Sequence, residues 1–429
     1  MRDYLTFLFR VGRISFQGSW KFYAWMTLLS VLVLVGLNAW ARQFVDGLQT
    51  TGMTNQVSWG AYIANFTFLV GVAAAAVMLV IPAYIYQKEH MHEVVLFGEL
   101  MAIAVILMCL LFVTVDLGHP ERFHHMIPPF GVFNFPGSIL SWDVIVLNGY
   151  LLLNLHIAGY LLYCRYHQRK PTRVFYIPFV FISILWAVSI HTVTAFLYVG
   201  LAGRSYWHHP LVPSRFLASA FVAGPALMIL TFQIIRRVTR YWIGDEPIFT
   251  LRMIMTVAMV INMFLLGCEL FTEYYSPTQH AAAAQYLYFG LHGHSGLVPW
   301  IWTAIALNVV GLTLLITPLS QRIGWLNLAC VASFAGIWTE KGMGLIIPAF
   351  IPTPLGEIVE YTPTLNESLV SLGVWAFGLL VFTIFVRVTV PVLSGRLSHD
   401  HPYSTEETDA DVVSPIAHEA HEHDMETVQ

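Results

Sequence analysis

Charged and titratable side chains crowd a short segment directly after a long apolar run. The run ends at Asp116, where Gly118 and Pro120 stop the helix because Gly relaxes the backbone and Pro lacks an amide donor. Proton exchange at a lipid–water boundary would need such a set of groups, although polar interfacial loops often have no chemical role. The set comprises Asp116, His119, Glu121, Arg122, His124 and His125.

Other apolar runs carry polar side chains at a similar depth. Asp143 opens the next run, Tyr62 and Asn65 lie in an earlier one, and His191 and Thr194 lie in a later one. At a rise of 1.5 Å per residue, His191 is about 14 Å below the outer end of its run. Polar groups within hydrocarbon usually face a bundle interior or a cavity, so these side chains are expected to converge.

The elements that position these groups are membrane-length helices. Hydrophobic residues make up 57% of the chain and charged residues 11%, against roughly a quarter charged in soluble proteins. We expect an all-α polytopic membrane protein, with spans 2–5 and 6–9 as two four-helix bundles flanked by spans 1 and 10. Apolar runs of about 20 residues, enough to cross a bilayer, recur ten times. They cover approximately 20–43, 59–86, 93–115, 140–164, 174–200, 213–235, 250–275, 297–318, 323–346 and 367–393.

The distribution of Lys and Arg predicts the orientation. With a cytoplasmic N-terminus, the alternation of ten spans places most of the 21 Lys and Arg residues on the cytoplasmic side. Both termini are then cytoplasmic, and the loop between Glu99 and Asp143 faces outward. No cleavable signal peptide is evident, because no small-residue site follows a short apolar core. The other face or an outer half-span keeps Arg42, Arg122, Arg204, Arg215 and Lys341.

The composition changes near residue 396. We expect a membrane domain over 1–395 and a disordered cytoplasmic tail over 396–429, which is acidic and rich in His. The His-rich end of this tail could bind a metal loosely, but a solvated tail is preferred. Four cysteines occur singly, without a CxxC or an iron–sulphur pattern, so electrons would have to come from a partner or a diffusible carrier.

Four segments of the chain form a recognisable set. They are Asp116–Phe123 (DLGHPERF), Ser138–Asp143 (SILSWD), Ser189–Phe196 (SIHTVTAF) and Arg215–Phe221 (RFLASAF). Together they resemble the NrfD/PsrC family of quinone-interacting membrane subunits. Within it the chain is most similar to the ten-span DsrP-type subunit of the sulphite-reductase-linked DsrMKJOP complex.

The resemblance implies a subunit without intrinsic iron–sulphur clusters in a bacterial or archaeal cytoplasmic membrane. It implies electron exchange between menaquinone or ubiquinone and a periplasmic ferredoxin-like iron–sulphur subunit, with further membrane and cytochrome partners and no nucleic acid. Sulphite or sulphide metabolism and coupled proton translocation follow from the same likeness. It also implies a quinone pocket near the outer ends of the first bundle.

Quinone oxidation releases two electrons and two protons, so the pocket needs hydrogen-bonding groups and a proton acceptor. For proton exchange we predict Asp116, His119, Asp143 and His191, and for holding the ring Tyr62, Asn65, Thr194 and Arg122. The alternative is an Asp116–Arg122 or Asp143–Arg122 ion pair that fixes the loop.

Two further groups of residues are candidates for a proton path. Glu99 and His156 both lie roughly 9–14 Å from the cytoplasmic ends of their spans and could touch. Glu269 and Glu273 share one helix face, and Glu269 is expected to pair with Lys341 near the outer surface. A buried hydrogen bond and a static ion pair are the structural alternatives.

The intramembrane histidines and carboxylates have two other interpretations. His156 and His191 would be axial ligands of a b-haem only at similar depth, and their depths of about 24 and 14 Å make haem unlikely. A proton-coupled secondary transporter is the alternative function. Transporters gather polar groups near the midplane of two repeats, whereas here they gather at the outer interface.

Overall fold

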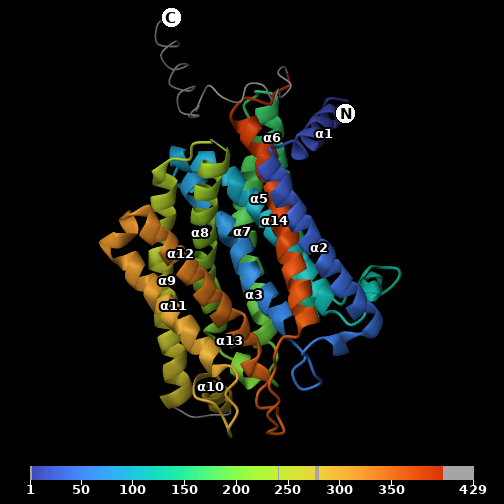
Figure 1. Ribbon diagram of the computed structural model, residues 1–429, viewed down its shortest axis with the longest axis vertical. Helices are drawn as coiled ribbons and strands as arrows, with labels where there is room; N and C mark the ends of the chain where they lie inside the picture. Colours follow the sequence, from blue (N-terminus) through green and yellow to red (C-terminus); the bar gives the residue numbers. More distant parts are fainter. Residues whose placement is uncertain (1, 240, 276–279, 400–429) are drawn as a thin grey trace, which may run out of the picture.

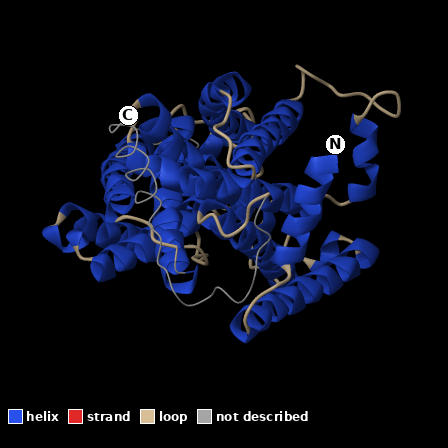
Figure 2. Ribbon diagram, turned by 90° about the horizontal axis from the view of Figure 1, so that it is seen from above, coloured by secondary structure: helices blue, strands red, loops and turns tan. Residues whose placement is uncertain are grey.

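The structure is a computed structural model that describes residues 2–239, 241–275 and 280–399. Within that part of the chain every regular element is helical (Figures 1 and 2). The predicted all-α architecture is therefore confirmed. The principal helices are α1 Arg2–Ser15, α2 Trp20–Asp46, α3 Ala61–Ala73, α4 Val77–Val80, α5 Glu89–Asp116, α6 Ile139–Tyr166, α7 Arg173–Val199, α8 Val212–Thr239, α9 Asp245–Tyr275, α10 His280–Tyr288, α11 Val298–Ile316, α12 Ile323–Lys341, α13 Met343–Ile346 and α14 Leu365–Leu393.

Nine of the ten predicted spans form helices long and apolar enough to cross a membrane, counted over the described residues. The exception is α12, which covers the predicted span 323–346. It has 19 residues and ends in Glu340 and Lys341, which shorten its apolar stretch. It packs between α8 and α11 like the neighbouring spans. Over the described residues, the prediction of ten spans thus corresponds to nine helices that are long and apolar enough to cross a membrane and to α12, which is as long as α11 but less continuously apolar.

The second span is irregular, for a local reason. It runs over Ala61–Ile85 as α3, a 3-10 turn Ala74–Ala76, α4 and a π turn Ile81–Ile85. Pro82 has no amide hydrogen for the regular ladder, and the Tyr86 amide instead donates to the Ile81 carbonyl at 3.2 Å. At the 3-10 turn, a Cβ atom added to Gly224 of α8 would lie 1.7 Å from the Ala75 Cβ. The two halves of the protein therefore touch where both helices carry small residues.

The helices form two groups of four. The segment 61–85 packs against α5 and α7, and α6 packs against those two helices on its other side. In the same way α8 packs against α9 and α12, and α11 packs against those two. The flanking helices α2 and α14 pair with each other, and α14 covers α5, so both lie on the first group (Figure 1). Of the 18-residue apolar stretch of α2 only 17% is buried, against 83% for the corresponding stretch of α5. Helix α2 is therefore a peripheral helix that faces lipid.

The two ends of the bundle differ. Helix α1 and the last turn of α14 lie at one end, which agrees with an even number of crossings (Figure 1). We call the opposite end, formed by the connections 47–60, 117–138, 200–211, 289–297 and 342–364, the distal end. At the other end Arg10 donates to the Tyr166 hydroxyl at 2.9 Å and to the His399 carbonyl at 2.8 Å. The predicted tail is thereby anchored up to His399, and its remainder lies outside the described residues.

Backbone contact between α2 and α14 supports a first prediction. A Cβ atom added at Gly36 would lie 2.6 Å from the Gly373 Cα, whereas one added at Gly159 of α6 would meet nothing within 4 Å. We expect Gly36→Leu to destabilise the protein by about 1–3 kcal/mol, because close helix packing needs a small residue there. Thermal unfolding in detergent should show a lower midpoint for Gly36→Leu than for the matched Gly159→Leu. Equal midpoints would contradict the contact.

Candidate functional site

Asp116 lies at the distal end of the first group, where its sequence context predicted it. It is the last residue of α5, and its Oδ1 atom is buried without a hydrogen-bond partner among the described residues. A carboxylate at a helix C-terminus gains nothing from the helix dipole. A buried polar atom without a partner is costly, and in native proteins it commonly marks a place for water or a ligand. Asp116 is therefore available for binding or proton transfer.

Asp143 and Thr194 are brought together. Thr194 of α7 donates to Asp143 Oδ1 of α6 at 2.7 Å, and both side chains are buried. His191 lies one turn earlier on the same face of α7, where its Nδ1 donates to the Ala187 carbonyl at 2.9 Å. Its buried Nε2 has no hydrogen-bond partner in the described structure and is the acceptor nitrogen when the ring is neutral.

Two residues outside the predicted site extend this interior surface. The Tyr198 hydroxyl of α7 hydrogen-bonds the Thr67 hydroxyl of α3. Tyr198 is seven residues after His191, so both follow one face of α7 toward the distal end. The helical period of 3.6 residues was the signal that could have identified Tyr198 from His191 and Thr194.

Tyr62 is linked to the peripheral helix by an unpredicted glutamine. Its hydroxyl donates to Gln43 Oε1 at 2.6 Å, and Gln43 Nε2 donates to the Val115 carbonyl at 2.6 Å. Gln43 is 3% exposed although most of α2 faces outward. This chain of hydrogen bonds joins α2, α3 and α5 directly beside Asp116.

Asn65 has its side chain committed to neighbouring helices. Its Oδ1 accepts from the indole nitrogens of Trp338 at 3.0 Å and Trp375 at 2.9 Å, and its Nδ2 donates to the Ala61 carbonyl. Those contacts tie α3 to α12 and α14. Asn65 therefore positions α3 against α12 and α14 in the wall of the candidate site.

His119 and Arg122 lie on the surface, apart from the buried groups. His119 Nδ1 lies 2.9 Å from Glu121 Oε1, and Arg122 Nε lies 4.0 Å from the same oxygen, with the Arg122 side chain 61% exposed. The ion pairs considered between Arg122 and Asp116 or Asp143 do not form. The connection from α5 to α6 begins with a 3-10 segment over Pro120–Met126 that contains no buried residue, and this segment carries these side chains at the surface.

Glu99 and His156 do not form the contact that their similar depths allowed. Both Glu99 oxygens are buried without a hydrogen-bond partner among the described residues. His156 lies on the exposed face of α6, where its Nε2 hydrogen-bonds the Phe175 carbonyl at 2.9 Å and its ring contacts Phe179. The two residues have comparable depths, but the rotation of α6 turns His156 away from the interior.

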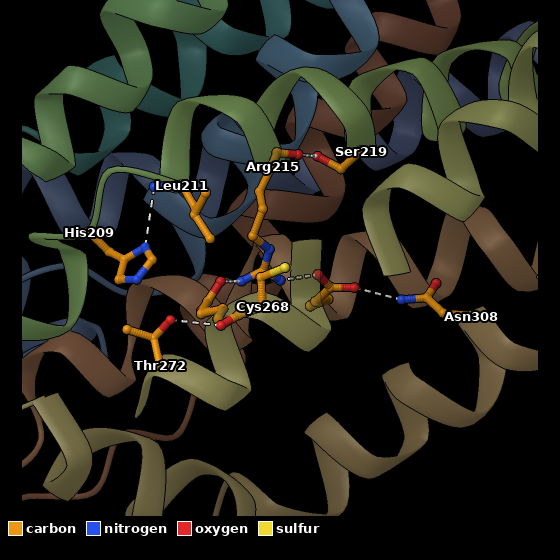
Figure 3. A network of polar contacts seen from close by, with 9 residues as sticks. His209, Leu211, Arg215, Ser219, Cys268, Thr272 and Asn308 are labelled. Carbon is orange, nitrogen blue, oxygen red and sulfur yellow. Dashed lines mark hydrogen bonds and ion pairs between the residues drawn. The ribbon is translucent and has the colours of Figure 1, made fainter. Parts of the chain in front are cut away.

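The second group of helices contains a buried charge network. Arg215 of α8 is ion-paired with both Glu269 of α9 and Glu340 of α12 (Figure 3). Glu340 also accepts from Asn308 Nδ2 of α11 at 2.6 Å. All four helices of the group therefore contribute to one network, which sequence spacing did not predict because it depends on which helices are neighbours.

Lys341 is not the partner of Glu269, contrary to expectation. The Lys341 ammonium lies 4.5 Å from the centre of the Phe216 ring, a cation–π contact, and the residue is 4% exposed. It lines a small cavity together with Arg215, Glu340, Tyr206 and Tyr288. Glu273 is buried one turn after Glu269 on the same helix. The proposed proton-path residues of this half thus border the Arg215 network.

Another buried carboxylate organises the distal loops. Glu367 in the first turn of α14 is fully buried and accepts from the amides of Gly52 and Ala61, both at 3.1 Å, and from the Tyr361 hydroxyl. A carboxylate at a helix N-terminus is stabilised by the free amides and the dipole. Glu367 thereby fixes the start of α3 and the position of Tyr62.

Glu360 links two distal loops and supports a pH-dependence prediction. The Gly296 amide donates to Glu360 Oε1 at 2.7 Å, and His294 and Tyr286 also bond this carboxylate. These bonds, that of Gly296 foremost, hold the pKa of Glu360 below the usual range of Glu. The charged Glu360 therefore stabilises the loops fully at pH values above the ordinary pKa of Glu. This stabilisation is lost as the pH falls through the lower pKa that Glu360 has in the folded protein.

We expect Glu360→Gln to raise hydrogen exchange at the Gly296 amide about 3- to 10-fold at pH 7, because a charged acceptor is replaced by a neutral one. The wild-type protein should lose protection there in acid, and the variant should show a flatter dependence. Exchange measured by mass spectrometry over 289–297 tests this, with Glu357→Gln in the same loop as the control. Identical acid profiles for wild type and Glu360→Gln would contradict it.

Metal-ligating side chains do not gather in the described part of the chain. No three of His, Cys, Asp and Glu come together there as a possible metal site. Cys109, Cys164, Cys268 and Cys330 are free and lie on separate helices. The candidate site consists of buried proton acceptors and hydrogen-bond donors.

The chain is similar in sequence to known proteins over most of its length. The family profile described as "Polysulphide reductase, NrfD" matches residues 49–351. The chain is 26% identical to a selenate reductase subunit of Mesobacillus selenatarsenatis over 86% of this chain and 94% of that protein. It is 25% identical to "Hdr-like menaquinol oxidoreductase integral membrane subunit" of Archaeoglobus fulgidus, over 86% and 93%. The profile match spans all of both helical groups and leaves α2 and α14 outside.

Proposed function

Because the chain belongs to the polysulphide reductase NrfD family, we propose that it is the quinone-interacting membrane subunit of a respiratory redox complex. One similar protein is named a menaquinol oxidoreductase subunit and another is a subunit of selenate reductase, which supports this role. In this proposal electrons pass between menaquinone or ubiquinone and an iron–sulphur subunit docked at the distal end. The protein acts only as part of that multi-subunit enzyme.

The observation that carries the proposal is a pair of buried acceptor atoms in the first helical group. Asp116 Oδ1 and His191 Nε2 both lack hydrogen-bond partners among the described residues. A bound quinol would supply two electrons and two protons, and its ring hydroxyls match these acceptors chemically. Asp116 and His191 would each accept a proton, and Thr194 would hold Asp143 in place. The Tyr62 hydroxyl, whose proton is donated to Gln43, would accept a hydrogen bond from a ring hydroxyl.

The remaining predicted site residues take supporting roles in this proposal. His119 would receive protons at the surface, as its exposure allows, and Arg122, a permanent cation, would add positive charge to this surface beside Glu121. Asn65 would shape the wall through the two tryptophans. We propose both termini on the cytoplasmic side, so that the distal end faces the periplasm, in agreement with the distribution of Lys and Arg.

Two finer proposals go with this role. The first is that the complex acts on sulphite or sulphide, as the resemblance to DsrP-type subunits suggests, although the similar proteins described above are named for selenate and menaquinol. The second is proton translocation past Glu99 in the first group and along Glu269, Glu273 and Lys341 in the second, without His156, which faces outward. Buried Glu99, with no hydrogen-bond partner in the described structure, supports the first segment of such a path.

Purification from native membranes tests the function directly. We expect the chain to copurify with iron–sulphur and catalytic subunits and to retain quinone that organic extraction and chromatography can identify. Reduction of the partner's clusters should then follow addition of a short-chain quinol. A protein that carries no quinone and has no redox partner would contradict the proposal.

A proton-coupled secondary transporter is the second candidate. It is favoured by one observation, the buried Arg215–Glu269–Glu340 network that joins all four helices of the second group. Reconstituted vesicles would decide between the candidates. Substrate uptake driven by a pH gradient, without quinone or partners, would support the transporter.

A further inference from the structure

The second half of the connection between α5 and α6 exposes an apolar surface at the distal end. Between His125 and Asp143 the sequence contains no charged residue and no histidine. Its large apolar side chains are nevertheless exposed, Phe130 to 73% and Val132 to 80%. Exposed apolar side chains that gather in one segment mark a site of interaction with a protein or a membrane. We define the distal apolar patch as the exposed side chains of Ile127, Phe130, Val132, Phe135, Leu140 and Trp142.

The tip of this connection is held by its own backbone. The Ile127 carbonyl accepts hydrogen bonds from the amides of Phe130 at 2.9 Å and Gly131 at 3.2 Å. A Cβ atom added at Gly131 would lie 1.6 Å from the His125 carbonyl oxygen, so the turn is closed too tightly for any residue but glycine. This turn therefore presents the side chains of Phe130 and Val132 to the outside.

The connection lies beside the helices and not beyond their ends. It projects sideways next to the lower end of α2 in Figure 1, whereas the connection 342–364 extends further down. The indole nitrogen of Trp142, in the first turn of α6, donates to the Pro136 carbonyl at 3.0 Å, and the centroids of the Trp142 and Phe135 rings are 4.9 Å apart. The end of the connection is thus folded back along the start of α6.

The patch continues into the lipid-facing side of α6. Leu140 and Trp142 belong to the helix itself, and exposed apolar side chains follow further along it, among them Ile145, Leu152 and Leu155. Trp is frequent where hydrocarbon meets water, because its ring is apolar and its N–H is polar. Hydrocarbon offers no partners to the amides and carbonyls of an irregular backbone, so the connection itself must lie at the level of the lipid headgroups.

We propose that residues 126–142 form a membrane anchor in the leaflet at the distal end. The backbone lies among the lipid headgroups, and the Phe130 and Val132 side chains insert between the acyl chains. The continuity of the patch with the lipid-facing side of α6 favours lipid over a partner protein as the occupant. The anchor holds the charged 3-10 segment Pro120–Met126 at the membrane surface, because both belong to one connection. This inference does not depend on the proposed function.

Fluorescence from a single labelled cysteine tests the anchor in the full-length chain, reconstituted in phospholipid nanodiscs. Val132→Cys carries the probe at the tip of the anchor. Leu355→Cys is the matched control, because Leu355 is 88% exposed in the distal connection 342–364, which contains Glu357 and Glu360 and is expected to lie in water. Cys268, the half-buried one of the four cysteines, is replaced by Ala in both variants.

The probe at position 132 should lose its fluorescence to a phospholipid that carries a nitroxide near the headgroup end of its acyl chain, and the probe at position 355 should lose it to iodide in the water. Adding Phe130→Glu should reverse the result at position 132, because a carboxylate is costly in hydrocarbon, whereas adding Phe130→Leu should leave it unchanged. Equal iodide quenching at positions 132 and 355 would overturn the anchor. So would a probe at position 132 that iodide reaches in the chain alone and no longer reaches in the purified complex, since the patch would then bind a partner protein.

Discussion

Replacing Asp116 by Asn is expected to lower quinol-dependent electron transfer about 100- to 10,000-fold, the usual contribution of a positioned proton acceptor. Asn has nearly the same shape, so the helix end and the neighbouring Tyr62–Gln43 contact should persist. An amide cannot accept a proton at neutral pH, however, and the buried Oδ1 without a partner would lose its function. Stopped-flow reduction of the partner's clusters by a short-chain quinol measures the rate.

Glu121→Gln is the control for this prediction. Glu121 lies five residues further along, in the same loop, and its side chain is 47% exposed. The substitution removes a carboxylate at the same membrane surface without touching the buried group, so turnover should stay within about twofold, as for most surface changes. Equal losses in the two variants would indicate that the loop's charge is what matters. Full activity of Asp116→Asn would remove Asp116 from the mechanism.

The depth of each polar residue could be predicted from the sequence, because the rise per residue along a helix is fixed. Asp143 and Thr194 were expected at one level, and they form a hydrogen bond. Glu99 and His156 were also expected at one level, yet His156 faces outward and bonds Phe175. Each residue turns a helix by about 100°, and the nearly uniform hydrophobicity of α6 does not identify its inward face.

Pairing between helices was the part that the sequence could not provide. Lys341 was expected to neutralise Glu269, but Arg215 does so because α8 lies between α9 and α12. Gln43 was not predicted because it lies in the last turn of an apolar, outward-facing helix, and only its contact with Tyr62 shows that its side chain faces the interior. Such partners depend on helix neighbours and rotation, which a single sequence leaves open.

Replacing Arg215 by Met is expected to destabilise the protein by about 3–5 kcal/mol, because it leaves the Glu269 and Glu340 carboxylates buried without their cation. The chain should accumulate poorly in the membrane and unfold at a lower temperature in detergent. Arg236→Met is the control. Arg236 pairs with Asp245, and because the Asp245 side chain is 58% exposed, the carboxylate left without its cation stays hydrated and the loss should be smaller than for Arg215→Met.

Neutralising the carboxylates as well distinguishes a structural from a proton-conducting network. In the triple variant Arg215→Met, Glu269→Gln, Glu340→Gln the cation and both carboxylates of the network are removed together, so accumulation and thermal stability should largely recover. If the network only holds the four helices together, this stable variant should retain quinol oxidation and any coupled proton uptake. If the network conducts protons, quinol oxidation should continue while proton uptake by reconstituted vesicles stops, because no titratable side chain remains at positions 215, 269 and 340. Failure of the triple variant to regain stability would show that the contacts, and not their charges, stabilise this half of the protein.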